Sequence, residues 1–104
     1  MTTKIETLDS LADGWREQAD KHRAEVMCAL DAVACRAARS AVELTARRYD
    51  DANRAVQAVE DSAAEAREAL DMMFAALAEA AELDGAAAML EETADLAAYH
   101  AKVL

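Results

Sequence analysis

Between Gly14 and Gly85 the chain runs for seventy residues without a glycine or a proline, and no proline occurs anywhere in its 104 residues. Glycine and proline are the residues that most often end helices and form tight turns. An all-β fold needs frequent turns and is therefore excluded. A catalytic α/β domain is excluded too, because the sequence contains no glycine-rich loop and no strand-like run. We expect an all-α protein.

Alanine dominates the apolar composition. It supplies 29 of the 57 apolar residues, whereas Leu, Ile, Val and Phe together supply 18. Alanine is the best helix former, and small side chains at packing positions let two helices approach closely. The composition therefore predicts stable helices with coiled-coil-like, alanine-rich packing.

Four segments are expected within a single helical domain spanning 1–104. The pairs Asp13-Gly14 and Asp84-Gly85 are the only glycine punctuation. A weaker interruption at 49–53 contains short polar side chains that suit a helix start, and two arginines that suit a helix end precede it. The expected segments are an N-terminal turn or short helix at 1–14 and helices at 15–48, 52–83 and 86–103.

The two longer helices match in length, which favours an antiparallel hairpin with a shorter third helix. The competing interpretation is one helix that continues through residue 50 and forces a rod-like dimer. Residues 52–83 carry the clearest heptad pattern, with ten of ten core positions apolar or aromatic. One line of positions is Tyr49, Val56, Ala63, Leu70 and Leu77, and the other is Ala52, Val59, Ala66, Met73 and Ala80.

The helix at 15–48 shows two apolar stripes instead of one. The first contains Val26, Leu30, Val33, Ala37 and Leu44, and the second contains Cys28, Cys35, Val42 and Tyr49. Only an arc with Glu25, Arg36, Arg39, Glu43 and Arg47 is plainly polar. A helix this apolar needs neighbours on two sides, so we expect the second stripe to mediate self-association into a dimeric helical bundle.

The charge is strongly acidic and unevenly distributed. The net charge is −10, and residues 60–95 carry eleven acids against the single base Arg67. Seven of these acids fall on one arc of the expected helix: Glu60, Asp61, Glu65, Glu68, Asp71, Glu79 and Glu82. They could be a solvated surface, or they could pair with arginines of the preceding segment (Arg36, Arg39, Arg47, Arg48 and Arg54). The third interpretation is a surface that docks on a basic groove of another protein.

This third interpretation predicts a non-enzymatic interaction module, acting as an inhibitor or adaptor on a nucleic-acid-handling protein. The analogy is with the class of small acidic inhibitors from phages and mobile elements, anti-CRISPR proteins included, and no motif ties the chain to one family. The alternative is a structural, self-assembling helical bundle with a merely solubilising acidic surface. A second alternative is a metal- or ligand-binding bundle at His22 and Glu25.

Other chemistry is scarce. Two histidines and three serines offer little for nucleophilic catalysis, so we expect no enzyme, no cofactor and no metal. The net charge argues against direct binding to nucleic acid or anionic membranes. Cys28 and Cys35 would lie about 10 Å apart on one helix, too far for a disulfide. We expect them to be buried small side chains in a cytoplasmic protein, with an intersubunit link or redox switch as the alternative.

Overall fold

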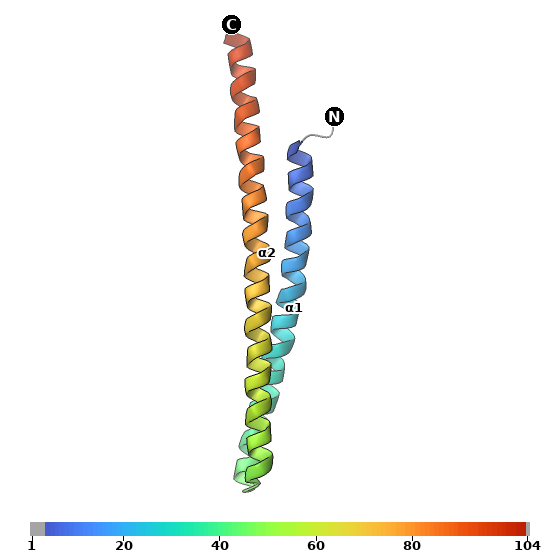
Figure 1. Cartoon of the computed structure of the whole chain (residues 1–104), viewed down its shortest axis with the longest axis vertical. Coiled ribbons are helices and arrows are strands. Elements are labelled where there is room, and N and C mark those ends of the chain that lie inside the picture. The colour runs from blue at the N-terminus through green and yellow to red at the C-terminus, as the bar shows by residue number, and fades with distance from the viewer. Residues whose placement is uncertain (1–3, 104) are drawn as a thin grey trace. The chain divides into compact units, whose positions relative to one another are not determined.

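The computed structural model describes residues 4–103, and almost all of them lie in two α-helices (Figure 1). Helix α1 spans Lys4–Thr45 and α2 spans Tyr49–Val103. Only residues 46–48 separate the two helices, which run antiparallel. The all-α class and the antiparallel hairpin are thus confirmed, and the single helix through residue 50 is wrong.

The expected third helix is absent from the described residues. Gly85 was expected to separate helices at 52–83 and 86–103, but it lies inside α2, which is 55 residues long. Gly14 likewise lies inside α1 and does not precede it. Glycine in a helix interior costs about 1 kcal/mol relative to alanine, which is not enough to end a helix among strong helix formers. Neither glycine has the positive φ that would mark a helix end.

The turn between the helices closes with a Schellman arrangement. Arg47 adopts a left-handed conformation with φ of 58°. The Arg48 amide donates to the Glu43 carbonyl at 2.8 Å, and the Arg47 amide donates to the Leu44 carbonyl at 3.0 Å. Tyr49 then begins α2, with two aspartates in its first turn, where they favour the positive end of the helix dipole. The interruption expected at 49–53 therefore falls a few residues earlier.

The chain divides into two compact units, each containing part of both helices. The turn unit is Asp20–Met73, and the terminal unit is the described part of Met1–Ala19 together with Phe74–Leu104. In the turn unit the helices meet along a seam whose buried residues are spaced by three and four. Its buried members are Val26, Ala29 and Glu43 on α1 and Ala52, Ala55, Ser62, Ala66 and Ala69 on α2.

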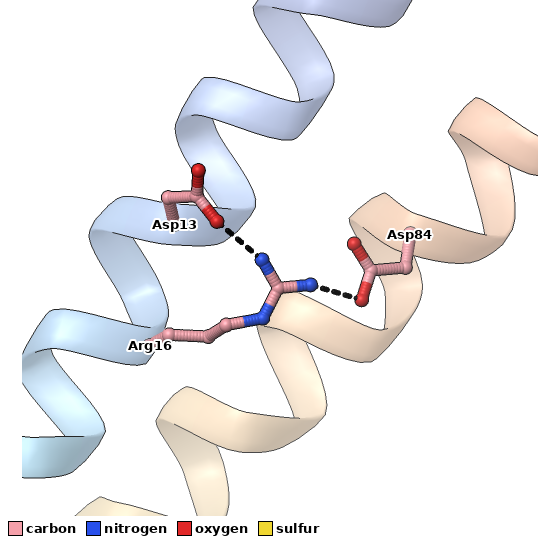
Figure 2. Close-up of polar contacts among 3 residues, drawn as sticks. All are labelled: Asp13, Arg16 and Asp84. Carbon is pink, nitrogen blue, oxygen red and sulfur yellow. Dashed lines mark hydrogen bonds and ion pairs between the residues drawn. The ribbon is translucent and has the colours of Figure 1, made fainter.

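The terminal unit has a seam of the same kind, with Ala12 and Ala19 buried on α1 and Ala76, Ala80 and Ala87 buried on α2. Arg16 bridges the helices there, because its guanidinium donates both to Asp13 on its own helix and to Asp84 on α2 (Figure 2). These hydrogen bonds, the one to Asp84 first, raise the pKa of Arg16 above its ordinary value. Every described residue after Ala87 is exposed.

The seams show which of the two expected heptad lines lies between the helices. The line that begins at Ala52 lies in them, with Ala52, Ala66 and Ala80 buried. The line that begins at Tyr49 lies beside them, and both Tyr49 and Val56 are exposed. The reason is side-chain volume, since two helices that meet through alanine can pack most closely along the side that carries the smallest residues.

Candidate functional site

In most proteins the large apolar side chains are buried. Here the buried apolar residues are small and most of the large ones are exposed. Ten of the eleven buried hydrophobic residues are alanines, and Val26 is the exception. The large apolar side chains of the described chain are mostly exposed, among them Leu30 (49%), Leu44 (51%) and Val56 (43%). Scattered exposed leucines are ordinary, but apolar side chains that share one side of a helix pair indicate an interaction surface.

Leu30, Leu44 and Val56 share one side of the turn unit, whereas the exposed Val42 and Met72 lie on the other side. On α1, Leu30, Ala37 and Leu44 directly follow the seam positions 29, 36 and 43, and on α2, Val56, Ala63 and Leu70 directly follow the seam positions 55, 62 and 69. In an antiparallel pair of right-handed helices, the residues that follow such positions lie on the same side. We call these six residues the apolar face: Leu30, Ala37, Leu44, Val56, Ala63 and Leu70.

The opposite side of the turn unit is charged and grooved. One groove of about 540 Å³ is lined by Glu25 and Arg36 on α1 and by Glu65 and Glu68 on α2, together with five apolar residues: Cys28, Ala29, Ala32, Ala69 and Met72. A second groove of about 260 Å³ is lined by Arg36, Arg39 and Arg54, with Asp51. Both grooves take residues from both helices, which shows that the charged side chains of α1 and α2 lie together there.

The seam itself becomes polar toward the turn. Arg36 on α1 donates a hydrogen bond to the hydroxyl of Ser62 on α2, and Ser62 is fully buried. The Glu43 carboxylate is also buried and forms an ion pair with Arg48 at 3.4 Å. Arg36 and Glu43 belong to the arc that was expected to be plainly polar; Arg36 is exposed, whereas Glu43 is buried. The two residues share the helical line that faces α2, and serine opposite leaves room for the long arginine side chain.

The stripe expected to mediate self-association is not one line. Cys28, Cys35 and Val42 are exposed along one line of α1, but α1 ends at Thr45 and Tyr49 is the first residue of α2. Both cysteines are free and exposed, so the expectation that they are buried is wrong for the single chain. Cys28 lines the groove on the charged side of the turn unit, away from the apolar face.

The seven acids of the expected acidic face are all exposed. Five lie on α2 in the turn unit, and the other two, Glu79 and Glu82, lie in the terminal unit. None of the seven forms an ion pair with another described residue; the carboxylate of Asp61 accepts a hydrogen bond from Gln57 at 3.2 Å. Pairing with the arginines of α1 within one chain is therefore not seen, and the negative charge of these residues stays uncompensated.

Chemistry at His22 is limited to one pair. Its Nδ1 atom lies 3.2 Å from a carboxylate oxygen of Glu25, as the spacing of three residues on a helix allows. In the part of the chain that the structure describes, no group of three or more histidine, cysteine or acidic side chains could hold a metal ion.

Within the described residues, neither helix is long and apolar enough to cross a membrane.

Comparisons with known proteins add no assignment. No protein-family model matches the chain, and searches of curated proteins and of solved structures find no similar protein.

Proposed function

We propose that the protein is a non-enzymatic interaction module that works by packing the apolar face of its turn unit against helices of a protein partner. The single observation that carries this proposal is the distribution of side-chain size. The seam between α1 and α2 buries alanines, whereas Leu30, Leu44 and Val56 stay exposed on one side. A surface of this kind on a small protein is typical of an interface.

The energetics support association. A buried methylene contributes about 0.8 kcal/mol, so an alanine seam stabilises the hairpin weakly, whereas full burial of a leucine or valine contributes about 1.5–3 kcal/mol. Fixing the backbone of each residue costs about 1–2 kcal/mol. The free energy of unfolding of the isolated hairpin is therefore expected to be small. A partner that covers the apolar face supplies hydrophobic burial that the seam lacks.

The test places a charge on the apolar face. Changing Val56→Glu or Leu44→Glu is expected to abolish every association that the wild-type protein forms, measured by sedimentation velocity and by capture from cell extract. The matched control is Val42→Glu, which adds the same charge to an exposed residue on the line of Cys28 and Cys35. Loss of association only with Val42→Glu would move the interface to that line and contradict the proposal.

A second candidate function is supported by the uncompensated acids. In this version the module is an inhibitor or adaptor whose acidic face docks on a basic, nucleic-acid-binding groove of its partner. The support is that all seven acids are exposed and form no ion pair with described residues. Exposed unpaired charge attracts a surface of opposite sign and makes the association depend on salt.

This candidate is tested by capture from nuclease-treated extract, with the wild type compared against a variant whose seven acids are changed to glutamine. The candidate expects a basic protein that only the wild type retains, and that is released as salt increases. Equal recovery with both chains would make the acids a solvated surface and leave assembly through the apolar face.

The environment of the protein forms part of the proposal. Cys28 and Cys35 are free and exposed, and free thiols persist in reducing compartments. We therefore place the protein's work in the cytoplasm.

A further inference from the structure

Positive charge gathers near the turn of this acidic chain. Residues 36–54 carry five arginines against three acids, a net charge of +2, whereas the whole chain carries −10. The five are Arg36, Arg39, Arg47, Arg48 and Arg54. At physiological ionic strength charges are screened over about 8 Å, so a small ion near the turn responds to these local charges more than to the net charge.

Three of these arginines line one groove on the charged side of the turn unit. Arg36 and Arg39 come from α1 and Arg54 comes from α2, and the groove has a volume of about 260 Å³. Its other lining residues are Asp51, Ala55 and Ala58, and Ala55 is buried in the seam. The groove therefore combines small apolar residues with three positive side chains and one negative side chain.

The three guanidinium groups are poorly neutralised. Arg39 forms no hydrogen bond or ion pair with another described residue. Arg54 lies 3.7 Å from the carboxylate of Asp51, a loose ion pair between exposed side chains. Arg36 donates to the hydroxyl of Ser62, which uses one of the five N–H donors of a guanidinium. Most donors around the groove thus have no partner among the described residues.

Helix stability does not explain this arrangement. Arg36 and Arg39 are like charges three residues apart on α1, a spacing that destabilises a helix. Arg54 adds a third like charge to the same groove. The acids Glu65 and Glu68 line the other groove of this side and do not pair with these arginines. A bound anion would replace the repulsion between the arginines with attraction.

We propose that this groove, which we call the arginine groove, binds a small phosphate-bearing anion. Guanidinium groups are planar and donate pairs of hydrogen bonds to phosphate oxygens. Three arginines and Asp51 leave a local charge of +2, which matches the charge of about −2 on a phosphate group. The groove is smaller than the pockets of about 300–1,000 Å³ that enclose drug-sized ligands, so it suits the phosphate group itself.

This inference is independent of the proposed function. The arginine groove lies on the charged side of the turn unit, opposite the apolar face, and none of its lining residues belongs to that face. We therefore expect Val56→Glu to leave phosphate binding unchanged. Failure of phosphate binding would leave the apolar face as it is, and failure of the apolar face would leave the groove.

The first experiment is a titration of the whole chain with sodium phosphate at constant ionic strength, followed by NMR of the arginine Nε–H groups. If each exposed guanidinium contributes about tenfold, three give a dissociation constant of about 1 mM. We expect the signals of Arg36, Arg39 and Arg54 to shift. The signal of Arg67, an exposed arginine of α2 outside the groove, should stay in place. No saturable shift, or an equal shift at Arg67, overturns the proposal.

Single charge changes form the second experiment. Arg39→Gln is expected to weaken phosphate binding by about tenfold, whereas Arg67→Gln, with the same change in net charge, should stay within about twofold of the wild type. Asp51→Asn removes the acid of the groove and is expected to strengthen binding by about threefold. All three side chains are exposed, so circular dichroism should show unchanged helicity. Equal weakening by Arg39→Gln and Arg67→Gln, or weaker binding by Asp51→Asn, contradicts the proposal.

The source of the phosphate group is decided by comparing inorganic phosphate with phenyl phosphate, a simple ester. Binding of the ester within about threefold of inorganic phosphate supports the groove as a site for phosphorylated molecules. Binding of the ester at least tenfold more weakly supports free phosphate as the ligand. If neither compound shifts the signals of Arg36, Arg39 and Arg54, the arginine groove is not a phosphate site.

Discussion

Arg36 on α1 donates a hydrogen bond to the hydroxyl of Ser62 on α2, the one described side chain with no solvent exposure among the buried polar groups. This contact joins the two helices across the seam of the turn unit. It also places a polar side chain where the seam elsewhere carries alanine. The size of residue 62 is therefore expected to matter more than its hydroxyl.

Two substitutions at Ser62 separate these effects. Ser62→Ala keeps the small volume, and the exposed Arg36 can bind water in place of the hydroxyl, so we expect a loss of about 1 kcal/mol or less in the free energy of unfolding. Ser62→Leu overfills the seam and is expected to cost about 1–3 kcal/mol or more. Urea unfolding followed by circular dichroism gives both values. A milder effect from leucine than from alanine would show that the seam is not closely packed there.

Arg47 offers a stabilising substitution. Its φ of 58° lies in the left-handed region, which costs a non-glycine residue about 1–2 kcal/mol. Arg47→Gly removes this cost, offset in part by the greater freedom of glycine in the unfolded chain, so a gain of about 0.5–1 kcal/mol is expected. The control is Arg48→Gly, which removes the ion pair with Glu43 and should give no gain. Thermal unfolding of both variants at one protein concentration makes the comparison.

Gly85 tests the continuity of α2. It lies in the helix interior, and an added Cβ would meet no atom within 4 Å. Gly85→Ala is therefore expected to stabilise the protein by about 0.5–1 kcal/mol. If residue 85 were a turn between two helices, as the sequence suggested, alanine would destabilise the chain. The sign of the change in unfolding free energy decides between these outcomes.

The cysteines report on which side of the turn unit is covered. Both thiols are exposed, and Cys28 lines the charged groove on the side opposite the apolar face. We expect a thiol reagent such as Ellman's reagent to label both residues at similar rates in native protein and in denaturant, even when the apolar face is covered by a partner. Strong protection of Cys28 and Cys35 in the native protein would instead indicate association through their own line.

Part of this organisation could be predicted from the sequence. The helical class, the hairpin and a break close to the expected interruption at 49–53 follow from local preferences, since alanine favours helix and Asp50 and Asp51 favour a helix start. Gly14 and Gly85 were expected to mark breaks but lie inside helices, because no proline or left-handed residue accompanies them. The acidic face was also readable, because charge periodicity along one helix needs no knowledge of its partner.

The residues of the candidate interface could be predicted only in part from the sequence. Val56, Ala63 and Leu70 belong to one of the two heptad lines that predict coiled-coil-like packing, but the pattern does not say which line lies between α1 and α2. The signal that could have placed them outside is the parallel line of alanines at 52, 55, 66 and 69, which is smaller on average. The two lines have similar hydropathy, so apolar character alone does not say which of them faces the other helix.

The sequence by itself determined that this chain forms helices, where they reverse direction and on which arc the acids gather. Each of these properties depends on residues within a few positions of one another. Only the tertiary structure decided which side of each helix closes the seam, and hence that Leu30, Leu44 and Val56 are left outside while Glu43 is taken in. That choice depends on how closely two surfaces fit each other, and close approach through alanine is a property of the helix pair that neither helix shows alone.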